Sequence, residues 1–388
     1  MQAQIIHGYQ VAIVRLSIQW TVFKLALHHY KNPLIAFKAL KHMLKLRQKV
    51  TGYSGGIKKM VKQNSMRYIG MYVPEIHGSN FKIFVQNELR NYLPIKRPSK
   101  QFNSIFFAIT KKCALRCEHC FEWEVLNQKE TLNDESIEQI VNHILTLGAN
   151  QLYFTGGEPT LRLPVVFDVL RKVRHTIDCW LFTSGYGLKP SIALKMKKEG
   201  LKGVVVSIDH FEKEKHNHFR GNSKSFTWAT QAVQNALNAG LLVTLSVCVT
   251  KKLASKSSLA MYMEFAKGLG VHYVQFLEPK AVGNYEGKDV CLTNEQIADL
   301  ETIFLRYNYQ KGYKRYPIIL YQGYHQRRIG CFNGGFSGLY IDTDGGINAC
   351  PFCHTKKGNL LDTNFKEKLA ILTKEGCPMY GERIAMIN

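Results

Sequence analysis

The sequence of 388 residues predicts an α/β fold built on a parallel sheet, and three observations support this class. Between residues 103 and 290, short apolar runs alternate with helical patterns, which is typical of consecutive right-handed βαβ units. Polar and cysteine residues follow these runs, where the carboxyl ends of parallel strands form binding sites. A hydrophobic content of 45% and a charged content of 21% are typical of a soluble globular protein.

The predicted strands and helices follow one another without long gaps. The six strand candidates are "SIFFAIT", "QLYFTGG", "CWLFTSG", "GVVVSID", "LVTLSVCVT" and "VHYVQFLEP". The helices between them are expected near residues 134–147, 163–175, 190–199, 225–239 and 257–269. A chain of this length exceeds one comfortable core, so we expect further domains on either side of the βα units.

The first hundred residues are predicted to form a basic, mainly helical extension. Residues 8–50 indicate two helices broken at Asn32-Pro33, because proline disfavours helix at the residue before it. Residues 1–100 hold 17 Lys and Arg against Glu75 and Glu88, which gives +15 of the net charge of +23. The second helix is basic and amphipathic. It could cap the main domain, lie on an anionic membrane surface or bind an acidic polymer.

The cellular compartment is predicted from the cysteines and from the apolar runs. Ten cysteines in a chain of this size, without a signal peptide, favour a reducing cytoplasm. No run approaches the roughly twenty uninterrupted apolar residues of a membrane span. We therefore expect a cytoplasmic protein, with peripheral membrane association left open by the basic extension.

Three cysteines follow the first predicted strand at CxxxCxxC spacing. Cys113, Cys117 and Cys120 lie in "KKCALRCEHCF", and no fourth cysteine follows closely. Thiolates are soft ligands that suit zinc or an iron–sulfur cluster. Structural zinc would need a fourth ligand, for which His119 is awkwardly placed between two coordinating neighbours. Three thiolates on a four-iron cluster leave one iron open to a ligand that is not protein.

This loop and the "GGEP" motif after the second strand, at residues 156–159, closely resemble the radical S-adenosylmethionine (radical SAM) enzymes over residues 103–285. The resemblance implies a partial (β/α)6 TIM-type barrel, which we place at residues 101–290. It implies a [4Fe–4S] cluster whose open iron is chelated by the methionine part of S-adenosylmethionine. An electron from the reduced cluster then cleaves this cosubstrate, and the 5'-deoxyadenosyl radical abstracts hydrogen from a substrate.

The resemblance also assigns roles to single residues. Glu158 is expected to accept the methionine ammonium, and Gly156 and Gly157 to permit close backbone approach. His119 stands where the family usually has an aromatic residue beside the adenine. The expected contacts to ribose or carboxylate are Ser184, Ser207 and Arg220.

Cysteines recur in residues 331–388, after a predicted helix and connector at residues 291–330. A hairpin turning at Asp344-Gly345 is expected among them, and alone the pattern would fit a zinc ribbon. After a radical SAM core it resembles the SPASM extension or its shortened form, twitch, in a small α+β domain. That implies an auxiliary [4Fe–4S] cluster with Cys331, Cys350, Cys353 and Cys377 as ligands, for one of which His354 could substitute. We interpret the other three cysteines, Cys179, Cys248 and Cys291, as buried apolar residues.

The sequence predicts the class of enzyme in more detail than its substrate and the outcome of its reaction. An oxidative outcome needs a base near the radical carbon, and Asp209 and Glu278 at strand ends are candidates. Capping or salt bridging is an equally good interpretation of both. The resemblance implies an electron donor such as flavodoxin or ferredoxin, and a peptide or protein substrate. The basic extension favours a lipid or lipid-linked substrate as the alternative.

Two alternatives to this enzyme remain open. A non-catalytic iron–sulfur protein would carry electrons, but such proteins generally close their cluster with a fourth ligand. The aromatic and basic stretch "GYKRYPIILYQGYHQRR" could stack on nucleic acid. Because no recognised nucleic-acid module accompanies it, we favour a bridge between barrel and C-terminal domain.

Overall fold

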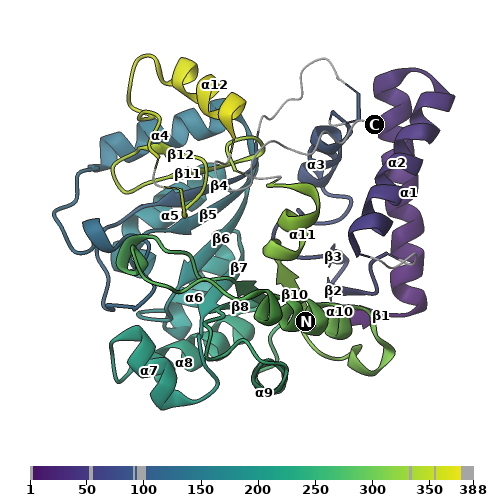
Figure 1. Cartoon of the computed structure of the whole chain (residues 1–388). Helices are drawn as coiled ribbons and strands as arrows, with labels where there is room; N and C mark the ends of the chain where they lie inside the picture. Colours follow the sequence, from purple (N-terminus) through teal and green to yellow (C-terminus); the bar gives the residue numbers. More distant parts are fainter. Residues whose placement is uncertain are drawn as a thin grey trace.

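The protein is an open α/β barrel with helices on its outside (Figure 1). The computed structural model describes residues 3–51, 56–90, 92–93, 102–331, 334–353 and 355–376. Its main sheet runs in the order β10-β9-β8-β7-β6-β5-β4-β11-β12. Every neighbouring pair in this sheet is parallel except β11 with β12.

The strands of this sheet are β4 (Phe102–Ala108), β5 (Ala149–Thr155), β6 (Asp178–Thr183), β7 (Leu201–Ser207), β8 (Leu242–Cys248), β9 (Tyr273–Leu277), β10 (Ile318–Tyr321), β11 (Gly338–Ile341) and β12 (Ile347–Asn348). The helices that accompany it are α4 (Asp134–Leu147), α5 (Leu163–Val173), α6 (Pro190–Lys198), α7 (Lys213–Arg220), α8 (Ser225–Asn238), α9 (Lys256–Gly268), α10 (Asn294–Tyr309), α11 (Gln322–Ile329) and α12 (Phe365–Glu375). The six predicted strands and five predicted helices are thus confirmed, with shifts of one or two residues at their ends.

The sheet is larger than the predicted six strands at both ends. β10 adds a seventh strand in parallel register with β9, inside the stretch expected to be a connector. At the other end β11 pairs in parallel with β4, and the predicted hairpin at Asp344-Gly345 joins β11 to β12. The C-terminal segment therefore continues the sheet of the core.

Two apolar layers hold the barrel together. The larger lies between the sheet and the helices, and it includes buried side chains such as Ile140, Leu170 and Met263. The smaller lies on the inner face and is rich in aromatic rings, among them Tyr153 and Trp180. Strands buried on both faces read as continuous apolar runs, which is why the sequence pattern locates them well.

The N-terminal extension contains more β-structure than expected. A three-stranded antiparallel sheet, β1 (Gln4–His7), β2 (Lys59–Gln63) and β3 (Met66–Tyr68), stands beside α1 (Tyr9–Tyr30), α2 (Pro33–Thr51) and α3 (Ser79–Leu89). The predicted break is confirmed, since Asn32 Oδ1 accepts a hydrogen bond from Leu34 N at 2.9 Å. Residues 94–101, between this extension and β4, lie outside the described residues.

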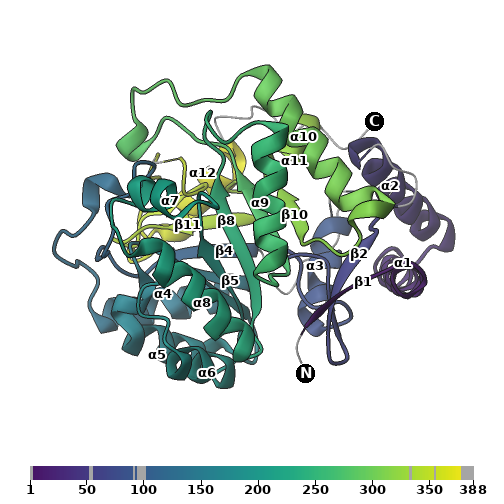
Figure 2. The ribbon, with the colours of Figure 1, turned by 90° about the horizontal axis from the view of Figure 1, so that it is seen from below.

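This extension is anchored to the barrel. The ammonium of Lys59 donates hydrogen bonds to the carbonyls of Tyr316 at 2.9 Å and Pro317 at 3.1 Å. Met71 is buried in the inner aromatic layer, and its carbonyl accepts a hydrogen bond from Tyr153 Oη at 2.8 Å. Figure 2 shows β1, β2 and α3 against the open side of the barrel. The extension therefore closes the inner face of the sheet.

Helix α1 bears on the expectation about membranes. Among the described helices, α1 is long and apolar enough by length and composition to cross a membrane. The sequence pattern missed it because Arg15 and Lys24 interrupt the apolar run. These two are the only Lys, Arg, Asp or Glu residues in its 22 positions, so the mean hydropathy still reaches 1.2.

Candidate functional site

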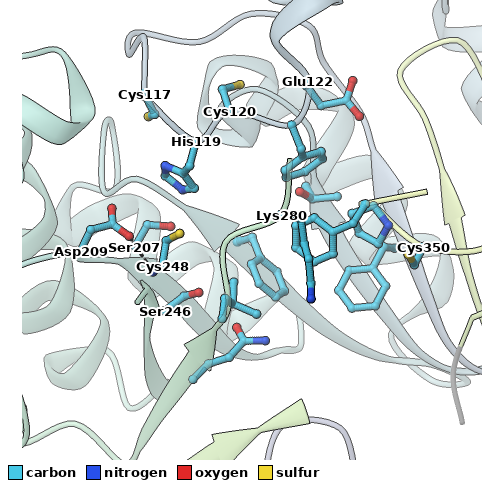
Figure 3. A pocket seen from close by; sticks show the side chains of 18 of the residues that line it. Cys117, His119, Cys120, Glu122, Ser207, Asp209, Ser246, Cys248, Lys280 and Cys350 are labelled. Carbon is cyan, nitrogen blue, oxygen red and sulfur yellow. Dashed lines mark hydrogen bonds between the residues drawn. The ribbon is translucent and has the colours of Figure 1, made fainter. Parts of the chain in front are cut away.

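A cavity with a volume of about 280 Å³ lies at the carboxyl ends of the strands. The loop after β4 contributes all three thiols of the CxxxCxxC motif, Cys113, Cys117 and Cys120, to its wall. In Figure 3, Cys117, His119 and Cys120 lie on one side, above the strand-end residues Ser207 and Asp209. The predicted placement of the unusual residues at one edge of the sheet is confirmed.

The cysteine loop is held in place mainly through its backbone. Cys120 O accepts a hydrogen bond from Asn284 N at 2.9 Å, and Cys117 O accepts one from Asn284 Nδ2 at 3.3 Å. Asn127 Oδ1 accepts a hydrogen bond from Cys113 N at 2.9 Å. These contacts fix the main chain, and two of the thiols also accept hydrogen bonds, Cys113 from Leu115 N at 3.4 Å and Cys117 from Arg220 Nη1 at 3.6 Å.

The glycine pair after β5 is required by this loop. Gly157 N donates to Thr110 O at 2.8 Å, so the two segments lie backbone to backbone. A Cβ atom on Gly156 would stand 2.5 Å from Thr110 O, and one on Gly157 would stand 2.2 Å from Lys112 O. Gly156 also has a φ of 129°, which strongly favours glycine. Both glycines also line the cavity.

Glu158 is buried behind the cavity wall, with 1% of its surface exposed. Its Oε1 accepts hydrogen bonds from Thr183 Oγ1 at 2.8 Å and from Thr160 Oγ1 at 2.9 Å. Its Oε2 accepts from Ser184 N at 2.7 Å and from Ser184 Oγ at 2.5 Å. Burial raises the pKa of Glu158, and these hydrogen bonds oppose the rise. The predicted contact with a methionine ammonium would compete with donors that the protein already supplies.

Asp209 and Arg220 form a buried ion pair. Arg220 Nε lies 2.5 Å from Asp209 Oδ2, and Arg220 Nη1 lies 3.6 Å from Cys117 Sγ. Burial would raise the pKa of Asp209, but the charge of Arg220 outweighs it and holds that pKa below its usual range. Cys248 N donates to the other oxygen of Asp209 at 2.9 Å. Asp209 is therefore a paired carboxylate, and Arg220 brings positive charge to one of the three thiols.

The thiols themselves are strongly desolvated. Burial raises the pKa of Cys113 and of Cys120 to about 12, and it raises the pKa of Cys117 against the opposing charge of Arg220. Such thiols stay protonated until a metal displaces the protons. Among the described residues, no three His, Cys, Asp or Glu side chains are grouped as for a single metal ion. A cluster spreads its thiolates more widely, because each binds a different iron atom.

His119 lies where its sequence position predicted a flat face. Its ring stacks on Phe219 with centroids 4.7 Å apart and an angle of 18° between the planes. Burial lowers the pKa of His119 to about 4, so the imidazole is neutral near pH 7. Its Nδ1 is buried without a hydrogen-bond partner. A ligand can therefore find a neutral ring at this point of the wall, whereas Nδ1 is covered by the protein.

Glu278 lies at the end of β9 and faces charged neighbours. Its Oε1 accepts hydrogen bonds from Arg327 Nη1 at 2.6 Å and from Tyr321 Oη at 2.7 Å. Lys280 Nζ is 3.8 Å from its Oε2. Like Asp209, Glu278 lines the cavity but is already paired, which supports the salt-bridge alternative for both candidate bases.

The C-terminal cysteines meet the same cavity. Cys331 and Cys350 line it, and Cys353 is buried with its backbone bridged to Cys350. Figure 3 places Cys350 across the cavity from Asp209. Cys377 and His354 lie outside the described residues. The sequence did not indicate that the two cysteine groups share one cavity, since more than 200 residues separate them.

Several residues that line the cavity were not predicted from the sequence. Tyr72, from the N-terminal extension, lines the cavity and accepts a hydrogen bond from Gln275 Nε2 at 2.5 Å. Thr183 lines it beside Ser184. Thr183 could have been indicated by its place at the end of a predicted strand, whereas no local pattern indicated Tyr72. The interpretation of Cys291 as buried is wrong, because its side chain is exposed, whereas Cys179 and Cys248 are buried as expected.

An open α/β barrel with three cysteines from one loop in its cavity has ligands that suit an iron–sulfur cluster. Residues 107–254 match the profile of the Radical SAM superfamily, which identifies a radical SAM domain over these residues. Members of the superfamily are enzymes that use a [4Fe–4S] cluster and S-adenosylmethionine. The predicted family and the α/β fold are thus confirmed.

Known relatives support the same assignment. The chain is 31% identical to the GTP 3',8-cyclase of Nautilia profundicola over 47% of this chain and 59% of that protein. It is 26% identical to the AdoMet-dependent heme synthase of Methanosarcina barkeri over 68% of this chain and 80% of the relative. Because the chain spans little more than half of the Nautilia cyclase, the activity of that relative is not transferred to it.

Solved structures share the fold. The structure of anSMEcpe with bound AdoMet matches 72% of this chain and 84% of its own, with a TM-score of 0.57 and 20% identity. Streptococcus suis SuiB bound to S-adenosylmethionine matches 93% of this chain and 82% of its own, with a TM-score of 0.56 and 15% identity. At these identities the similarity concerns the fold alone.

Proposed function

We propose that this chain binds a [4Fe–4S] cluster through Cys113, Cys117 and Cys120, and that it uses S-adenosylmethionine to abstract hydrogen from a peptide or protein. The observation that carries the proposal is the convergence of three desolvated thiols and the glycine pair on one cavity. The donor set fits the cluster, because thiolates are the usual ligands of iron. When bound and reduced, the cluster supplies the electron that cleaves the sulfonium.

The residues of the chain would position the cosubstrate and exclude water. Gly156 and Gly157 offer a surface without side chains, and Ser184 and Ser207 offer hydroxyl groups at neighbouring strand ends. His119 offers a neutral ring. Arg220, already beside Cys117, would balance part of the negative charge of a thiolate-bound cluster. The family resemblance assigns the same roles to the glycines, the serines and His119, whereas for Arg220 it implies a contact to ribose or carboxylate.

We further propose an auxiliary cluster bound by Cys331, Cys350 and Cys353, with Cys377 or His354 completing its ligands. The observation in support is that Cys331 and Cys350 line the cavity opposite the first loop. A cluster at this place could exchange an electron with a substrate radical. A flavodoxin- or ferredoxin-type protein would reduce the first cluster.

A peptide substrate is proposed because the C-terminal cysteine segment resembles the SPASM extension, which is found in enzymes that modify peptides. A lipid-linked substrate is the second candidate. The second is favoured by exposed apolar side chains on α1 and α2, including Leu16 at 66% and Leu34 at 73%. A precursor peptide or a lipid offered to the reconstituted enzyme separates the two, since only the true substrate should accelerate formation of 5'-deoxyadenosine.

The test of the enzyme itself is anaerobic reconstitution followed by S-adenosylmethionine and a reductant. We expect about eight irons per chain for two clusters, and release of 5'-deoxyadenosine. Replacing the three loop cysteines with alanine should abolish the product and leave about four irons. Replacing Cys331, Cys350 and Cys353 is the matched control for the second site. Full iron content without 5'-deoxyadenosine would instead favour an electron carrier.

A further inference from the structure

Helix α1 carries an apolar stripe that faces away from the protein. Tyr9, Ile13, Leu16 and Trp20 are 74%, 62%, 66% and 58% exposed. Their spacing of four, three and four residues places them on one side of the helix. Within the described residues, no element covers this stripe.

Helix α2 adds a second exposed apolar group. Leu34, Phe37 and Leu44 are 73%, 59% and 43% exposed, whereas Ala36 and Ala39 are fully buried. The two helices pack against each other and form an outer edge of the molecule in both views (Figures 1 and 2). Together α1 and α2 make one helical hairpin with large apolar side chains in solvent, which a soluble monomer rarely shows over such a length.

The same hairpin is basic. Five lysines on it are exposed, namely Lys24, Lys31, Lys38, Lys41 and Lys45. No Asp or Glu occurs in the sequence before Glu75. Lys24 Nζ lies 5.6 Å from the centre of the Trp20 ring. A lysine beside an exposed tryptophan is the arrangement that suits the headgroup level of a bilayer, where the ring is half buried and the amine reaches the phosphates.

We propose that the α1–α2 hairpin docks this protein on an anionic lipid bilayer, with the helices lying in the plane of the headgroups. The apolar stripes would enter the acyl boundary, and the lysines would contact lipid phosphates. An acidic protein or a nucleic acid would match the charge but would leave large apolar side chains such as Leu16 and Leu34 unexplained. No residue of α1 or α2 lines the cavity, so docking on a bilayer does not depend on the proposed chemistry.

A surface orientation agrees better with the structure than a spanning one. The inner side of α1 places Val22 and Ala26 in a core shared with α3. Tyr30 Oη donates a hydrogen bond to Leu89 O at 2.8 Å, and Ser17 Oγ is 2.8 Å from His77 Nε2. Insertion across the bilayer would break this packing, whereas docking on the surface leaves it intact.

The experiment is co-sedimentation of the full chain with vesicles of phosphatidylcholine, with and without phosphatidylglycerol. We expect binding to the anionic vesicles at low salt and much weaker binding at high salt, because salt screens the lysine contacts. The double variant Leu16→Ser, Trp20→Ser should lower the partition coefficient by about tenfold or more. Both side chains are exposed, so the fold should tolerate the changes.

The matched control is the double variant Leu194→Ser, Met261→Ser, which changes side chains 57% and 50% exposed on α6 and α9. It should bind as the wild type does. Trp20 should also show a blue-shifted emission on anionic vesicles that is lost in Trp20→Phe. Absence of binding at low salt, equal losses in both double variants, or undiminished binding of the α1 variant would overturn the proposal. Undiminished binding of the α1 variant would mean that charge alone holds the protein to the vesicles. An acidic polymer would then be the better partner, and binding to RNA would test it.

Discussion

Arg220 Nε lies 2.5 Å from Asp209 Oδ2, and this buried pair joins the end of β7 to the loop of the three cysteines. The link arises because Arg220 also reaches Cys117, and its backbone carbonyl accepts a hydrogen bond from Arg116 N at 3.3 Å. A pair in this position orders the cysteine loop, so its first role is structural. That assigns Asp209 a different role from the base suggested by its place at a strand end.

Asp209→Asn should destabilise the protein and weaken its hold on iron. The change leaves the Arg220 charge buried without its partner, which typically costs about 3–5 kcal/mol. Chemical denaturation and iron content after reconstitution measure both effects. The control is Asp168→Asn, which breaks an exposed pair with Arg171 and should cost less than about 1 kcal/mol. A stable Asp209→Asn protein with full iron content and cleavage of S-adenosylmethionine, but no product, would return Asp209 to the role of base.

Glu158→Gln tests whether this carboxylate acts through Ser184. One amide nitrogen would face donors that now bond to a carboxylate oxygen, so we expect a loss of about 1–3 kcal/mol in stability. Affinity for S-adenosylmethionine should fall about tenfold, because each 1.4 kcal/mol of lost binding is a factor of ten. Equilibrium dialysis with the reconstituted protein gives this affinity.

A double-mutant cycle with Ser184→Ala separates two roles for Glu158. If Glu158 positions Ser184, the losses in affinity of the two single variants should not add in the double variant. If Glu158 binds the cosubstrate directly, they should add. Thr160→Val serves as the control, since Thr160 bonds to Glu158 but does not line the cavity, and it should lower stability without changing this affinity.

Asp344→Asn should loosen the C-terminal hairpin from the cysteine loop. Lys111 Nζ lies 2.6 Å from Asp344 Oδ1, and the Lys111 side chain is 4% exposed. Because Asp344 itself is 35% exposed, the cost should be below the roughly 3–5 kcal/mol of a fully buried pair. Hydrogen exchange in β11 and β12 should rise above that of wild type. Unchanged exchange there would mean that the pairing of β11 with β4 holds the segment by itself.

The sequence predicts the barrel well because its strands are local and apolar. The runs at β5 and β8 are buried on both faces, so burial and sequence pattern coincide. Strand β10 was missed for the opposite reason. Its four residues, Ile318–Tyr321, stand among tyrosines and basic residues, and only pairing with β9 makes them a strand.

The residues of the site also fall into those that the sequence predicts and those that it does not. Cysteine spacing and the glycine pair are local patterns, so they could be predicted. The partners of these residues come from distant segments. Asp344 pairs with Lys111 across more than 200 residues, and Tyr72 reaches the cavity from the N-terminal extension. A single sequence carries no record of such pairs. For this reason the sequence could not choose between a base and a salt bridge for Asp209 and Glu278, whereas the structure shows both in ion pairs.

The stability of the protein should depend on pH through His272, a buried residue that does not line the cavity. Its ring is 3% exposed, and Nδ1 accepts a hydrogen bond from Val243 N at 3.0 Å. Burial lowers the pKa of His272 to about 4, below the value of 6.5 for a free side chain. The unfolded chain therefore binds the proton more readily between these values. The contribution of His272 is complete above about pH 6.5 and is lost as the pH falls toward 4, at up to about 1.4 kcal/mol per pH unit.

His272→Gln removes this titration and keeps an oxygen that can accept from Val243 N. The variant should be less stable than wild type at pH 7.5, and the difference should shrink by about 1.4 kcal/mol at pH 5.5, one unit below the free pKa. Urea unfolding at the two pH values measures it. Other buried histidines remain in both proteins, so their contributions cancel in the difference. His218→Gln, at an exposed position, should follow wild type at both values. A difference between His272→Gln and wild type that is the same at both pH values would show that folding does not shift the pKa of His272.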